Sequence, residues 1–142
     1  MIHVLIDSTV PLNIYLDGIK GQNRPGPKAS AEVMAASWKG NIHGYITPTA
    51  YSNVIYFLNK FLSPGEARVK ASDMLDSYDI IGQDESVFRD ALASGWKDIE
   101  DAGQYEAARR NAAITHICTN NVDDYPVKNM KVLTPEELLM LL

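Results

Sequence analysis

Acidic and amide side chains follow predicted strands at separate places in this chain. Asp7 comes directly after the apolar segment 2–6, and Asn121 and Asp124 come after the apolar segment 115–119. In open parallel sheets, ligands bind outside the carboxyl ends of the strands. We therefore expect these side chains to meet at one edge of a sheet.

A second group of acids opens a predicted helix. Asp98, Glu100 and Asp101 lie at its start, and Asp98 and Asp101 are one turn apart, so they can share a face. Such carboxylates repel one another unless a cation lies between them, and hard cations such as Mg²⁺ or Mn²⁺ prefer oxygen ligands. The chemistry expected of the cluster is metal-assisted phosphodiester hydrolysis, in which a metal activates water and stabilises the leaving oxygen.

The composition is that of one globular domain. The 142 residues are 46% hydrophobic and 22% charged, and the net charge of −5 argues against a general nucleic-acid coat protein but not against an enzyme acting on RNA. No apolar run reaches the roughly 18 residues of a membrane span. The first residues lack a basic leader, and Cys118 has no cysteine to pair with. These features predict a cytoplasmic protein without membrane association.

Apolar runs, prolines and capping signals predict strands alternating with helices. Strands are expected at 2–6, 45–47, 79–81, 115–119 and 131–133, and helices at 9–16, 27–38, 48–61, 64–77, 84–93, 98–111 and 136–142. The segment 18–27 is expected to be a mobile loop between two helices. This alternation predicts a single three-layer α/β domain over 1–142, with a central, mainly parallel sheet of about five strands flanked by helices.

Five segments occur in an order and at spacings that resemble the PIN-domain family of VapC-type toxin ribonucleases. They are DSTVPL (7–12), TPTAYSNVIY (47–56), DIEDAGQY (98–105), ICTNNVDDYP (117–126) and VLTPEE (132–137). Each segment alone is weak, but together they span nearly the whole chain. The resemblance implies a metal-dependent ribonuclease using Mg²⁺ or Mn²⁺, often the toxin of a prokaryotic toxin–antitoxin pair and often a homodimer.

The resemblance also assigns site residues. It implies that Asp7, Asp98 and Asp101 are the catalytic and metal-binding acids, with Thr9 and Asp124 as supporting polar residues. Two further positions depart from the usual pattern: Asn53 stands where the family usually has Glu, and Asn121 where it usually has Asp. The resemblance is to a branch with asparagine at both positions.

An asparagine oxygen can ligate a metal but brings no charge. The predicted site therefore holds about three negative charges, enough for one Mg²⁺ or Mn²⁺ with help from the substrate rather than a tight two-metal site. The alternative function is a catalytically weak or inactive PIN-like module that binds RNA or protein. A phosphatase or phosphotransfer domain is disfavoured, because Thr9 stands where such a pattern needs a second Asp.

Structural explanations remain open for several of these residues. Asp7 could cap the first helix, and acids such as Asp98 and Glu100 stabilise a helix start electrostatically. Asn121 and Asp123 are common turn formers. Asn53 could be an ordinary polar residue on a mostly buried helix, and the three histidines are expected to be structural.

The basic residues are scattered along the sequence. Arg24 and Lys28 flank the predicted loop, and Arg109 and Arg110 follow the acids along the predicted helix 98–111. Either pair could meet an RNA backbone by charge alone.

Overall fold

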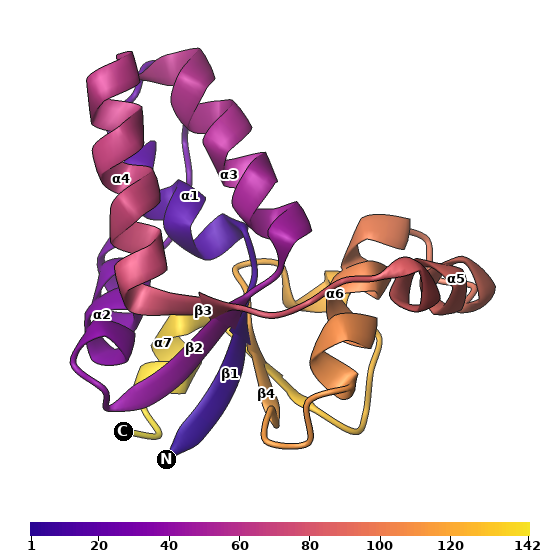
Figure 1. Ribbon diagram of the computed structural model, residues 1–142. Coiled ribbons are helices and arrows are strands. Elements are labelled where there is room, and N and C mark those ends of the chain that lie inside the picture. The colour runs from indigo at the N-terminus through magenta and orange to yellow at the C-terminus, as the bar shows by residue number, and fades with distance from the viewer.

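A five-stranded parallel sheet forms the centre of the computed structural model, which describes residues 1–142 (Figure 1). The strands are β1 (Ile2–Ile6), β2 (Ile42–Ile46), β3 (Tyr78–Ile80), β4 (His116–Cys118) and β5 (Lys131–Leu133), in the spatial order β3-β2-β1-β4-β5. Every neighbouring pair is parallel, so all the strands end at the same edge of the sheet. The predicted α/β architecture is confirmed.

Helices cover both faces of the sheet. They are α1 (Thr9–Tyr15), α2 (Pro27–Trp38), α3 (Pro48–Phe61), α4 (Pro64–Ser77), α5 (Glu85–Ala93), α6 (Ile99–Arg109) and α7 (Pro135–Leu139), with a 3₁₀ turn at Val122–Asp124. Helices α3 and α4 rise side by side as an arm beyond the strand ends, while α5 and α6 pack together on the other side of the sheet (Figure 1).

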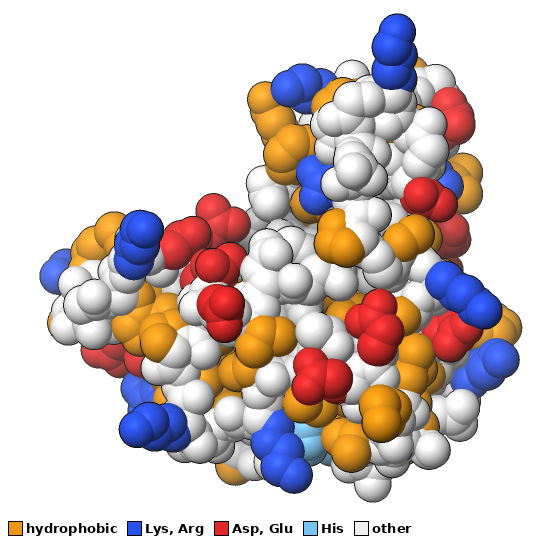
Figure 2. All heavy atoms as spheres, turned by 180° about the vertical axis from the view of Figure 1, so that it is seen from behind, with side chains coloured by type: hydrophobic (Ala, Val, Ile, Leu, Met, Phe, Trp, Pro, Cys, Tyr) orange, Lys and Arg blue, Asp and Glu red, His pale blue; other side chains and the backbone are white.

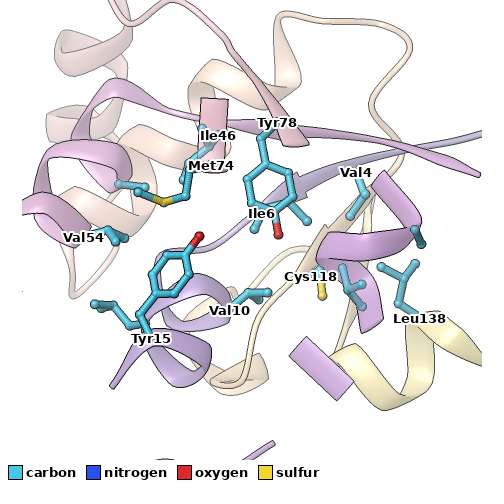
Figure 3. Close-up of a cluster of buried hydrophobic side chains, with 14 of the residues drawn as sticks. Val4, Ile6, Val10, Tyr15, Ile46, Val54, Met74, Tyr78, Cys118 and Leu138 are labelled. Atoms are coloured by element: carbon cyan, nitrogen blue, oxygen red, sulfur yellow. The ribbon is translucent and has the colours of Figure 1, made fainter. Parts of the chain in front are cut away.

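The hydrophobic core is split by the sheet into two parts of unequal size. The larger cluster of 18 buried residues joins one sheet face to α1–α4 and α7, and Figure 3 shows Tyr15, Tyr78 and Met74 pointing into it beside Ile6 and Val10. The smaller cluster of seven lies on the opposite face under α6. Burial of this apolar surface is the dominant force that fixes the helices against the sheet.

The segments that cap helices behave as their sequences predict. Ser63 and Glu66 form a reciprocal capping box at α4, as do Thr134 and Glu137 at α7. These signals are local, so they need no tertiary contact to form.

None of the helices combines the length and hydropathy of a segment that crosses a bilayer.

Several predicted boundaries shift by a few residues. β2 begins at Ile42 rather than at residue 45, because residues 42–44 continue the pairing with β1. Gly44 allows a close approach there: a Cβ at this position would lie 2.7 Å from Tyr78 Cδ1 and 2.8 Å from Ser37 Oγ. The terminal helix ends at Leu139 rather than at residue 142.

Candidate active site

The strand ends bring two distant segments together at one point. Asp7 follows β1 and Thr119 follows the neighbouring strand β4, and the Asp7 backbone N–H donates to the Cys118 carbonyl at 3.0 Å. Both side chains are buried, with exposed fractions of 4% and 0%. The sheet edge predicted from the sequence is therefore where Asp7 lies.

The Asp7 carboxylate is held by five donors. Oδ2 accepts from the Thr9 backbone N–H at 3.1 Å, the Thr9 hydroxyl at 2.6 Å and the Thr119 hydroxyl at 3.1 Å. Oδ1 accepts from Gln104 Nε2 at 3.2 Å and the Tyr125 hydroxyl at 2.8 Å. A buried carboxylate requires such donors to remain ionised. The contact with the Thr9 N–H also satisfies the first backbone donor of α1, although Ser8 is the N-cap of that helix.

The segment after β4 is tied into the same network. The Asn120 N–H donates to Thr9 Oγ1 at 3.1 Å, and the Asn121 N–H donates to Thr119 Oγ1 at 3.0 Å. Each threonine hydroxyl thus donates to Asp7 and accepts from this segment. Thr9, predicted as a supporting polar residue, supports Asp7 directly.

The acids at the start of α6 form a less constrained group. Asp98 is the N-cap of the helix, and its Oδ1 accepts from the backbone N–H groups of Glu100 at 2.8 Å and Asp101 at 3.4 Å. Asp98 therefore stabilises the start of the helix, as the structural explanation in the sequence analysis suggested. Its Oδ2 makes no hydrogen bond with the protein.

Asp101 is the most perturbed carboxyl of the site. Burial, and then the charges of Asp7, Asp98, Asp124 and Glu100, raise its pKa from 3.8 to about 7. Burial and neighbouring acids also raise the pKa of Glu100. These shifts place Asp7, Asp98, Asp124 and Glu100 within electrostatic reach of Asp101.

The two asparagines come from separate segments, one on α3 and one after β4, and their side chains make few contacts. Asn53, half-buried on α3, donates from Nδ2 to Ser8 Oγ at 3.4 Å, next to Asp7. The Asn121 side chain is exposed and makes no hydrogen bond with the protein. Both therefore stand near the acids without being tied to them.

The acids line an open hollow. A pocket of about 530 Å³, called here the acid pocket, lies between α6 and the segment after β4, and its walls include Trp96, Asp98, Asp101, Asp123 and Asp124. Figure 2 shows red acidic side chains gathered in the concavity between the α5–α6 lobe and the α3–α4 arm. Trp96 stacks on Tyr105 and meets Tyr125 edge-on, so it forms a rigid wall.

The sequence matches the PIN domain family over residues 3–123. This chain belongs to the PIN domain family. The solved structure of VapBC2 from Rickettsia felis bound to a promoter DNA fragment is similar, with a TM-score of 0.66 at 14% identity, covering 94% of this chain and 98% of that one.

Two further solved structures share the fold. FitAB bound to the IR36 DNA fragment has a TM-score of 0.61 at 14% identity, covering 93% of this chain and 94% of that one. FitAcB from Neisseria gonorrhoeae has a TM-score of 0.60 at 12% identity, covering 94% and 98%. No curated protein matches the sequence significantly.

The acids of this PIN domain provide the negative charge that a hard cation requires. They are not arranged as a complete set of ligands. No three His, Cys, Asp or Glu side chains are placed to ligate one ion together. Mg²⁺, however, needs only one or two carboxylates, with waters and substrate phosphate completing its shell. Burial, followed by the charges of adjacent acids, raises the pKa of Asp101, and a cation would offset both effects. The residues present therefore suit a cation bound through water and one or two acids.

Three residues of the PIN-domain site were missed from the sequence: Thr119, Gln104 and Tyr125. Thr119 is the last residue of the predicted strand 115–119, so the reasoning that found Asp7 at a strand end could have included it. Gln104 lies three residues after Asp101 on the same helix and shares its face. Tyr125 carries no such signal, because its hydroxyl reaches Asp7 from an irregular segment. Gln104 Oε1 is buried without a hydrogen-bond partner, which leaves an acceptor open beside Asp7.

Proposed function

We propose that this PIN domain is a metal-dependent endoribonuclease that hydrolyses RNA phosphodiesters with Mg²⁺ or Mn²⁺. The observation that carries the proposal is the pair of unlike carboxyls at the sheet edge. Asp7 is buried and fixed by five donors, and the neighbouring Asp101 has a pKa raised to about 7 by burial and adjacent acids. Strongly perturbed carboxyls in an open pocket are typical of functional sites.

Asp7, Asp98 and Asp101 are the residues proposed to hold the cation. When bound, the cation would lower the pKa of an attacking water and stabilise the leaving oxygen. Asp7 contributes a fixed negative charge, because its partners prevent rotation of the carboxylate. Asp98 has one free oxygen, and Asp101 loses its proton near neutral pH, when the pocket can attract a cation.

The surrounding residues position these acids. Thr9 and Thr119 orient Asp7, while Trp96 forms a wall of the acid pocket. Asn53 and Asn121 are proposed to bind water or substrate as neutral oxygens. Asp124 adds charge at the rim of the pocket.

A protein partner forms the second part of the proposal. The resemblance to VapC-type ribonucleases supports the role of a toxin in a prokaryotic toxin–antitoxin pair, acting as a homodimer in the cytoplasm. The structures with the same fold include VapBC2 and FitAB, each bound to a DNA fragment. Co-expression with the product of a neighbouring small gene, followed by sizing of the purified material, tests this part: a separate, monomeric chain would contradict it.

The nuclease proposal is tested with purified protein and single-stranded RNA in Mg²⁺, Mn²⁺ or EDTA. Cleavage is expected with either metal, and loss of cleavage in EDTA. Asp101→Asn should abolish it, whereas Asp17→Asn, a matched change of an exposed acid in the turn after α1, should not. Absence of cleavage by the unchanged protein under all conditions would refute the proposal.

A non-cleaving RNA- or protein-binding module is the alternative function. It is favoured by the neutral oxygens of Asn53 and Asn121 and by the absence of a preformed three-ligand cluster. Titration calorimetry separates the two functions. A nuclease should show a saturable Mn²⁺ site that disappears in Asp101→Asn, whereas a binding module should show none.

A further inference from the structure

A second pocket lies next to the site and differs from the acid pocket in its charge. It has a volume of about 340 Å³ and is formed by the start of α1, the segment between α1 and α2, and the segment after β4. No acidic side chain lines it, and Arg24 is its one cation. We call it the Arg24 pocket.

Neutral groups hold the Arg24 side chain in place. Nε donates to Gln22 Oε1 at 3.1 Å, Nη1 donates to Asn13 Oδ1 at 3.4 Å, and the guanidinium lies 5.6 Å from the centre of the Phe57 ring. Asn13 is only 2% exposed and also donates to the Pro25 carbonyl at 2.7 Å, so it anchors both the side chain and the loop. This segment was predicted to be mobile, and these contacts tether it at Pro25.

The guanidinium retains unused hydrogen-bonding capacity. Arginine has five N–H donors, of which the contacts to Gln22 and Asn13 use two. Partial burial lowers the pKa of Arg24, and no carboxylate lies within ion-pair distance. The pocket thus presents an uncompensated positive charge with free donors.

The other arginines are placed differently. Of the five in the chain, Arg89, Arg109 and Arg110 form ion pairs with Glu85, Glu106 and Asp90, and Arg68 is exposed on α4. Arg109 and Arg110, which we had also considered for RNA contact, are therefore already neutralised. Arg24 is the arginine that is both half-buried and without an acid.

Shared lining residues connect the Arg24 pocket to the acid pocket, and we call this row of pockets the polar groove. A third pocket between them shares Asn120 and Asn121 with the Arg24 pocket and Asp123 and Asp124 with the acid pocket. An extended chain lying in this groove would meet the acids at one end and Arg24 at the other. The exposed amide of Asn121 lies between the two ends.

We propose that the Arg24 pocket binds a backbone phosphate of the RNA strand whose scissile phosphodiester lies at the acids. This rests on the proposed ribonuclease function. A planar guanidinium with free donors matches the geometry of a phosphate. Its positive charge attracts the RNA backbone, whereas the acids at the other end of the groove repel it. Arg24 would thereby fix the register of the strand.

Binding of a short fluorescein-labelled single-stranded RNA tests this proposal without cleavage. Measurements are made in the Asp101→Asn background, in which the acid pocket carries less charge. Arg24→Met keeps an unbranched apolar side chain but removes the charge, Arg24→Lys keeps the charge without the planar guanidinium, and Arg68→Met is the matched control on α4. Far-ultraviolet circular dichroism and thermal unfolding verify that each variant is folded.

We expect Arg24→Met to bind RNA about tenfold more weakly than its background, since a charge-assisted hydrogen bond is lost. Its slope of log affinity against log salt should be smaller by about 0.7, which corresponds to one phosphate on a single strand. The RNA affinity of Arg24→Lys should lie between that of Arg24→Met and that of the Asp101→Asn background. Equal affinity and equal slope for Arg24→Met and its background would overturn the proposal.

Neutral methylphosphonate linkages, introduced one at a time, identify the group that is bound. One linkage should weaken binding when Arg24 is present and have no effect in Arg24→Met. If no single linkage behaves in this way, Arg24 contacts a base or the protein itself, and the phosphate assignment is wrong. A complete lack of RNA cleavage by the unchanged protein would refute the nuclease while leaving these binding results interpretable.

Discussion

Asp7 and Asp101 are neighbouring carboxyls with opposite environments. Asp7 is almost completely buried but receives five hydrogen bonds, so its charge is stabilised by the protein. Asp101 is half-buried and its carboxyl receives no hydrogen bond from the protein, and burial, followed by the charges of adjacent acids, raises its pKa to about 7. Burial alone therefore does not decide the state of a carboxyl; the donors and charges around it do.

The two carboxyls are therefore expected to have different roles in the site. Asp7 belongs to the framework and should matter for stability as well as for activity. Asp101 is held in an unfavourable electrostatic environment, so its charged form costs the folded state free energy, which a cation would offset. Local instability of this kind is common at functional sites.

The largest effect is expected from Asp7→Asn. The amide group would face hydroxyl and N–H donors, leaving buried donors unpaired, so the free energy of unfolding should fall by about 3–5 kcal/mol and RNA cleavage should be lost. Urea unfolding measures the first effect. The control Asp17→Asn should change stability by less than about 0.5 kcal/mol. If Asp7→Asn were as stable as the unchanged protein, the hydrogen bonds to Asp7 would not stabilise the fold. The proposed difference between Asp7 and Asp101 would then be wrong.

Asp101→Asn should abolish cleavage while increasing stability above neutral pH. Because the folded state keeps a proton on Asp101 that the unfolded chain has already lost, stability of the unchanged protein should decrease as pH rises from about 4 to about 7 and then level off. Asp101→Asn lacks this decrease and should be more stable by about 1–2 kcal/mol at pH 8, allowing for solvent screening. Urea unfolding at pH 5 and pH 8 tests the sign: destabilisation by Asp101→Asn at pH 8 would show that its charge is compensated within the protein.

The smallest effect is expected from restoring acids at the neutral positions. Asn53→Asp should tighten Mn²⁺ binding by about tenfold and Asn121→Asp by less, because affinity for hard cations follows the charge of the ligands and Asn121 is exposed. Without metal, each should reduce stability by at most about 1 kcal/mol. Calorimetry with Asn59→Asp, an exposed control on the same helix as Asn53, measures the difference. Unchanged Mn²⁺ affinity in both variants would place the cation away from these side chains.

Local signals made much of the fold predictable. β1, α2 and the capping boxes at Ser63 and Thr134 are encoded by neighbouring residues, so their bounds follow from the sequence. The start of β2 was missed because His43 and Gly44 break the apolar pattern. Their place in the strand depends on pairing with β1 and on the approach of Tyr78.

The site was less predictable than the fold. Asp7 and Asp101 stand at positions marked by strand and helix ends, and the sequence identifies them. Their surroundings depend on contacts across 97 to 118 positions in the chain, which join Asp7 to Gln104, Thr119 and Tyr125. No local pattern reports such contacts, so the contrast between a stabilised and an unstabilised carboxyl emerges only from the structure.

The central position of β1 has a consequence for the order of events during synthesis. β1 is among the first segments made, yet its neighbour β4 and three of the side chains that hold Asp7 lie in the last third of the chain. Closing such long loops is entropically costly, and parallel pairing between distant segments is intrinsically slow. A growing chain that has not yet made residues 104–125 can pair β1 with β2 only, and its Asp7 lacks three of its five donors. Nascent chains should be cleavage-incompetent until this last segment has left the ribosome.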